Sequence, residues 1–130
     1  PFRDDDGLLH IGYGTYAKKG DKMIDREEAA KRLFDEMDEK ASILRRKIGP
    51  AIWDNLLPSQ QWALADLAFH FGEANMQSII DAVKRHDFAL VSKLLVSPVY
   101  LTHKGREHSG FTNRAIWRRL LWEGIYAPAA

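Results

Sequence analysis

The chain contains no cysteine, which excludes disulfide bonds, thiol nucleophiles and thiolate metal sites. Neither charge predominates, because 19 lysines and arginines nearly balance 18 aspartates and glutamates. The chain also has 5 histidines. This balance does not indicate nucleic-acid binding. No apolar run approaches the roughly 18 residues that span a bilayer, and the first residues show no signal-peptide pattern. We therefore expect a soluble protein without a membrane span and without a nucleic-acid partner.

The length of 130 residues, 45% of them hydrophobic, is enough for one compact domain with a sizeable core. The sequence has no repeats and no low-complexity tract, so we expect a single domain over residues 1–130. The first residue is Pro1 rather than methionine, and the residues after it are typical of a hairpin. We expect this domain to be incomplete at its N-terminus.

Short runs punctuated by glycine predict a small antiparallel sheet at the start of the chain. Asp6-Gly7 interrupts Phe2–Thr15 with two residues that tolerate the positive φ of a tight turn, and Lys18–Ile24 predicts one more strand. Helical periodicity then begins at a capping box, Asp25 to Glu28, and ends at Gly49-Pro50.

The rest of the chain predicts helices. We expect a helical turn over Ile52–Leu57, an apolar central helix from Pro58 to Gly72, a helix from Asn75 or Gln77, a helix over Phe88–Val96, a break at Ser97-Pro98, a polar loop over Thr102–Ser109, and a last helix capped by Asn113 and closed by Gly124. The predicted fold class is α+β and mainly helical, with a small antiparallel hairpin or sheet at the N-terminus followed by a helical bundle.

Three adjacent carboxylates, Asp4, Asp5 and Asp6, are the first candidates for chemistry. Hydrolysis of a bond between two sugars needs a carboxylic acid on one side of that bond and a carboxylate or an activated water on the other. Taken alone, the three residues are better explained as a solvated turn. A family resemblance gives one of them a role.

The stretch Phe2-Arg3-Asp4-Asp5-Asp6-Gly7-Leu8-Leu9-His10-Ile11-Gly12-Tyr13-Gly14 resembles the hairpin signature of the phage-type lysozymes, the endolysins of glycoside hydrolase family 24. The resemblance implies that Asp4 is the catalytic aspartate and that Asp5 and Asp6 are non-catalytic. It also implies a lysozyme-like fold. In that family the aspartate works with a glutamate on the preceding helix.

Two further blocks are similar to the same family and come in its order. Ala65–Gly72 resembles the end of the central helix, which implies that Phe69 and His70 bind substrate. Asn113-Arg114-Ala115, with arginines following, resembles the C-terminal pattern in which the first arginine pairs with the catalytic glutamate. The resemblance therefore implies that Arg114 contacts the substrate site and tunes the acid.

Two positions depart from the family pattern. No glutamate of this sequence matches the position of the general acid, so we expect that residue to lie upstream of Pro1, and without it activity would be negligible. His10 stands where the family usually has threonine. Our hypothesis is that His10 acts as a base or nucleophile beside Asp4, which could change inversion into retention. The alternative is that His10 only packs or hydrogen-bonds on the hairpin.

Other conspicuous side chains have plainer explanations. His70 is slightly better explained as a satisfied core residue than as a sugar contact. The tryptophans at positions 53, 62, 117 and 122 are more typical of a core than of sugar platforms. Arg118 and Arg119 are typical of a solvated face or of partners for acidic residues. The histidines at positions 86, 103 and 108 lack metal-ligand spacing, so we expect no metal and no cofactor.

The resemblance implies a muramidase whose partner is bacterial peptidoglycan, working as a monomer or as a domain of a larger phage protein. We expect it to be phage-encoded and to act on the host cell wall, in the periplasm, or to be carried in a virion. One alternative is a catalytically inactive lysozyme fold that binds cell walls or builds a virion, since fold alone does not establish chemistry. Another is a helical nucleic-acid binder that uses Arg114–Arg119, whose DNA binding would weaken steeply with salt.

Overall fold

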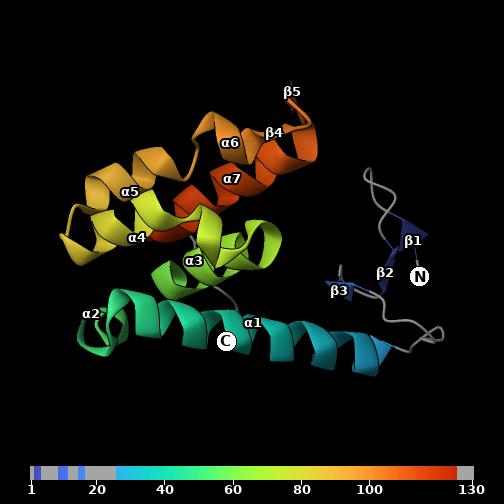
Figure 1. Ribbon diagram of the computed structural model, residues 1–130, viewed down its shortest axis with the longest axis horizontal. Coiled ribbons are helices and arrows are strands. Elements are labelled where there is room, and N and C mark those ends of the chain that lie inside the picture. The colour runs from blue at the N-terminus through green and yellow to red at the C-terminus, as the bar shows by residue number, and fades with distance from the viewer. Residues whose placement is uncertain (1, 4–8, 12–14, 17–25, 126–130) are drawn as a thin grey trace. The chain divides into compact units, whose positions relative to one another are not determined.

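The computed structural model describes residues 2–3, 9–11, 15–16 and 26–125 of the chain (Figure 1). The chain divides into two compact units, residues 1–39 and residues 40–130. Helices predominate and the sheets are small and antiparallel, which confirms the predicted α+β class. Among the described residues, no helix combines the length and the apolar character that crossing a membrane requires.

In the first unit, three short strands form an antiparallel sheet in the order β1-β2-β3. These strands are β1 (Phe2–Arg3), β2 (Leu9–Ile11) and β3 (Thr15–Tyr16). β2 is the middle strand, and its residue His10 lies opposite Phe2 on one side and Tyr16 on the other. The predicted N-terminal sheet is confirmed. The strand predicted within Lys18–Ile24 and the first residue of the capping box lie outside the described residues.

The long predicted helix is confirmed as α1 (Arg26–Ile48). Its first turn carries two glutamates and its last turn three basic residues, which suits the partial charges at the two helix ends. Gly49 ends α1 with φ 107, a conformation that residues with a side chain rarely adopt. α2 (Pro50–Asp54) begins earlier than the predicted Ile52, because proline suits the first position of a helix.

The predicted central helix is confirmed as α3 (Pro58–Phe71), which forms the middle of the second unit. Gln60 helps it to begin by accepting a hydrogen bond of 2.9 Å from the Leu57 backbone N–H. Gly72, with φ 84, ends it. The apolar face of α3 enters the main core, whose fully buried members include Leu44, Ala63, Leu64, Leu67, Ala68, Met76, Ala82, Val83, Val91 and Leu95.

The remaining elements pack around α3. They are the 3₁₀ turn η1 (Glu73–Asn75), α4 (Gln77–Lys84), α5 (Phe88–Leu94), α6 (Pro98–Leu101) and α7 (Ser109–Trp122). α4 packs against α5, while α3 and α6 both pack against α7 (Figure 1). Trp53 and Trp122 are buried, and Trp62 and Trp117 are half-buried against the same core. The tryptophans are therefore core residues, as expected.

The prediction of a polar loop over Thr102–Ser109 was wrong. Two short strands, β4 (Thr102–His103) and β5 (Arg106–Glu107), pair antiparallel there. Lys104 and Gly105 connect them with φ values of 53 and 77. Two consecutive positive φ angles make the kind of two-residue turn whose twist matches that of paired strands, so this polar segment closes as a hairpin.

The predicted start of the last helix at Asn113 was also wrong. α7 begins at Ser109, and its N-cap is His108, whose Nδ1 accepts a hydrogen bond of 3.2 Å from the Phe111 N–H. An imidazole nitrogen thus does what a hydroxyl or carboxylate usually does at this position. Asn113 is exposed within the helix. Gly124 follows α7 with φ 77, which confirms it as the predicted end.

Candidate functional site

The predicted site residues fall in both units. Asp4 lies outside the described residues, and for His10 the structure describes the backbone position in β2. Phe69, His70 and Arg114 belong to the second unit. His70 and Arg114 come together at one carboxylate, that of Asp66. The Phe69 ring meets the His70 ring edge-on, with 5.3 Å between their centres.

Helical spacing explains this arrangement. Asp66 and His70 are one turn apart on α3, and Arg114 and Arg118 are one turn apart on α7, so each pair lies on one face of its helix. α3 and α7 pack against each other. The two faces therefore meet as an acidic residue and a histidine against two arginines.

The Asp66 carboxylate binds both arginines. Its Oδ2 accepts hydrogen bonds from Arg114 Nε at 3.0 Å and from Arg118 Nε at 2.7 Å, and its Oδ1 accepts one from Arg114 Nη2. Arg114 thus holds the carboxylate with two donors, the strongest arrangement for this pair. His70 Nε2 lies 3.6 Å from Oδ1.

Burial divides these side chains into two classes. The Asp66 and Arg118 side chains are 3% and 1% exposed, whereas those of Arg114 and His70 are 45% and 40% exposed. Aromatic rings lie beside both guanidinium groups: Arg114 Cζ is 4.4 Å from the centre of the Trp117 ring, and Arg118 Cζ is 5.7 Å from that of Phe71. The result is a buried ion pair with one further cation and an imidazole at the surface.

The neighbours fix the charge of each group. Burial acts to raise the pKa of Asp66, but the Arg114 hydrogen bond and the Arg118 charge outweigh it and place the pKa below its usual 3.8. Burial lowers the pKa of His70 from 6.5 to about 4, with the two arginines adding to that effect and Asp66 opposing it. Near neutral pH the cluster therefore holds one carboxylate, two guanidinium groups and a neutral imidazole.

The sequence prediction missed Asp66 and the buried role of Arg118. A signal was present, because Asp66 is the one acidic residue in a helix that is otherwise nearly all apolar, and a buried charge needs a partner. Arg118 is that partner, while Arg119 pairs with Glu123 at 3.5 Å. His70 is partly exposed rather than a core residue.

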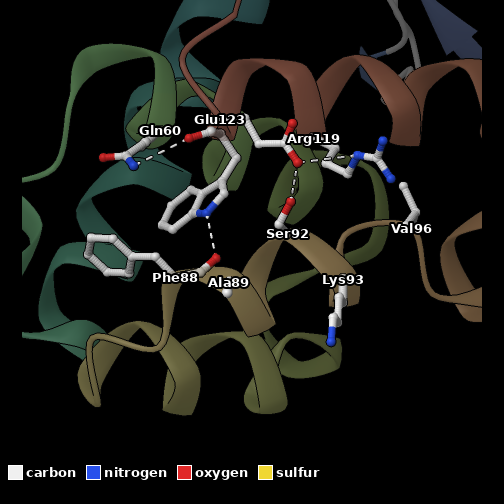
Figure 2. A pocket seen from close by; sticks show the side chains of 9 residues that line it. Gln60, Phe88, Ala89, Ser92, Lys93, Val96, Arg119 and Glu123 are labelled. Atoms are coloured by element: carbon white, nitrogen blue, oxygen red, sulfur yellow. Dashed lines mark hydrogen bonds and ion pairs between the residues drawn. The ribbon is translucent and has the colours of Figure 1, made fainter.

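A separate hollow of about 700 Å³ lies between α5 and α7 (Figure 2). Its apolar lining is formed by Phe88, Ala89, Val96 and Trp122. The Trp122 indole N–H donates to the Phe88 carbonyl at 3.1 Å. Its one carboxylate, that of Glu123, accepts a hydrogen bond from Ser92 and pairs with Arg119 (Figure 2). This carboxylate is already engaged, and none of the predicted site residues lines the hollow.

Most of the chain matches a known protein family. A model of the family described as phage lysozyme matches residues 1–117. The chain belongs to the phage lysozyme family. None of the curated proteins matches it.

The matched range contains every predicted site residue, from Asp4 to Arg114, and ends one residue before Arg118. Membership in the phage lysozyme family makes the chain a relative of glycoside hydrolases that act on peptidoglycan. Within the part of the chain that the structure describes, no three histidine, aspartate or glutamate side chains group closely enough to hold a metal ion.

Proposed function

We propose that this protein is a muramidase, which hydrolyses the β-1,4 linkage between N-acetylmuramic acid and N-acetylglucosamine in bacterial peptidoglycan. The observation that carries this proposal is the phage lysozyme match over residues 1–117, which includes both the hairpin with Asp4 and the helix with Arg114. Asp4 is the second carboxyl of the reaction. The general acid is the glutamate that precedes the hairpin in the family pattern.

The described cluster supports the roles proposed for Arg114 and His70. Arg114 presents a guanidinium that is partly exposed and held in place from behind by Asp66, as recognition of an anionic group requires. His70 is uncharged near neutral pH, so it contacts sugar by hydrogen bonding rather than by charge. Phe69 is half-buried beside it and offers an apolar edge.

Clearing of purified peptidoglycan by the full-length gene product tests the proposal. Asp4→Asn keeps the shape of the side chain and removes the charge, so we expect the clearing rate to fall by about 100-fold or more. Asp5→Asn is the matched control, because it makes the same change at the next residue of the sequence, and it should clear at the wild-type rate. Equal clearing by both variants would remove Asp4 from the mechanism.

A further inference from the structure

The carboxylate of Asp66 has more cationic partners than its burial requires. Arg118, 1% exposed and 2.7 Å away, already supplies one positive charge for one negative charge. Arg114 adds a second guanidinium to the same carboxylate, and its side chain reaches solvent. A pair that served only to neutralise a buried charge would be complete with Arg118, so the contact with Arg114 calls for another explanation.

The geometry of the contact shows which part of Arg114 stays available. Asp66 takes the Nε–H and one N–H of Nη2. A guanidinium is planar and carries five N–H donors, so the opposite edge, formed by Nη1 and the second N–H of Nη2, remains for another acceptor. Trp117 lies under the guanidinium plane at 4.4 Å. Asp66 and Trp117 together restrict both the rotation and the position of that free edge.

We propose that Asp66 is a positioning residue for the hydrolysis: it orients the Arg114 guanidinium toward the reacting groups, and Arg118 is the buried counter-charge that holds Asp66 in place. This inference rests on the proposed function. Asp66 touches no substrate in this scheme and acts through Arg114 alone. The lowered pKa of Asp66 is consistent with it, since the carboxylate stays ionised near neutral pH.

A purely structural role for Asp66 predicts different behaviour. In that case Asp66 and Arg118 form a buried ion pair, and any change that preserves stability preserves turnover. Replacing both by apolar side chains in Asp66→Leu/Arg118→Met separates the two roles, because apolar replacement of a complete buried pair is often neutral or stabilising. Asp66→Asn alone would leave Arg118 buried without a counter-charge, and its effect on folding would obscure the answer.

The experiment compares steady-state hydrolysis of soluble peptidoglycan fragments by wild type, Asp66→Leu/Arg118→Met, Arg114→Gln and the triple variant. We expect the double variant to fold with wild-type stability and to lose kcat by about 10- to 100-fold with little change in KM, since a displaced catalytic contact costs that much. In the Arg114→Gln background the same double change should lower kcat no further. Wild-type kcat in the double variant, or an equal loss in both backgrounds, would overturn the proposal.

A second measurement keeps this inference separate from the proposed function. The Nε–H signal of Arg114, followed by ¹⁵N relaxation, needs no substrate. We expect it to be ordered in the wild type and mobile in Asp66→Leu/Arg118→Met. The same order in both proteins would show that Asp66 does not position Arg114, whatever the enzyme hydrolyses, whereas wild-type protein that leaves peptidoglycan intact would contradict only the proposed function. If the double variant does not fold, Asp66→Glu is measured in its place, because it keeps the counter-charge for Arg118 and moves the carboxylate, and the same loss of order is expected.

Discussion

His70 makes the stability of the second unit depend on pH, because its imidazole is held in the neutral form. Its pKa falls from 6.5 to about 4 in the folded protein, mainly through burial. Between these values the unfolded chain takes up a proton that the folded chain does not, so unfolding becomes more favourable as the pH falls. We expect the urea midpoint of the wild type to drop between pH 7 and pH 4.5, by less than the full shift implies because the side chain is 40% exposed.

The control for this prediction is His70→Gln, which keeps a polar side chain and removes the titration. As the pH is lowered from 7 to 4.5, the urea midpoint of the wild type should fall relative to that of His70→Gln. Asp66 contributes in a separate window, because a carboxylate with a lowered pKa loses its stabilising effect only as the pH falls below its usual 3.8. Parallel midpoints for wild type and His70→Gln at every pH would contradict the assignment of a neutral His70.

His10 stands at a position where the family pattern has threonine, and our hypothesis gives it the role of base or nucleophile. If it forms a covalent glycosyl intermediate, the product keeps the anomeric configuration of the substrate. We expect wild type to give retention and His10→Thr to give inversion, measured by ¹H NMR of the first product from a muropeptide. Inversion by both proteins at the same rate would reduce His10 to a packing residue.

At the scale of the helices, the cap of α7 gives a direct test of the observed boundary. His108→Ala removes the acceptor for the Phe111 N–H and should lower the free energy of unfolding by about 1 kcal/mol. Asn113→Ala, at the position that the sequence predicted as the cap, should leave stability unchanged or slightly higher, because alanine is the better helix former. Urea unfolding of both variants at pH 7 checks this, and a greater loss in Asn113→Ala would place the cap where the sequence did.

Most helices could be predicted because their ends carry chemical signals. Gly49-Pro50, Pro58 and Gly72 mark boundaries that the structure confirms, since glycine permits a positive φ and proline suits a first helical turn. The β4-β5 hairpin was missed because its residues are polar and its turn, Lys104-Gly105, is not one of the strongest hairpin dipeptides. A histidine cap is equally hard to predict, because histidine rarely fills that role.

The site could be predicted only where a family pattern assigned roles. Phe69, His70 and Arg114 came from that resemblance, and whether they bind substrate stays a prediction. Asp66 was missed because its importance depends on α3 packing against α7, which brings together residues 48 positions apart. Periodicity shows that Asp66 shares a face with His70, but no pattern within one helix shows which residues of another helix meet it.

For the molecule as a whole, two independent observations support the same proposal. One is the geometry of the cluster around Asp66, and the other is the family match of the sequence. The match covers the first compact unit, residues 1–39, and the second unit as far as residue 117, and so includes the proposed carboxylate and the proposed arginine. Composition restricts the possibilities further, since a balanced charge gives little attraction to an anionic wall over long distances. On the proposed function, recognition then depends on close contacts such as those proposed for Arg114 and His70.

The most direct test of the proposed function identifies the sugar at the newly formed reducing end. Peptidoglycan is digested with the full-length gene product, reduced with borohydride, hydrolysed in acid and analysed for amino-sugar alcohols. A muramidase leaves N-acetylmuramic acid at the reducing end, so muramicitol should accumulate and glucosaminitol should not. Accumulation of glucosaminitol, or solubilisation that creates no reducing end, would contradict cleavage of the proposed linkage by hydrolysis.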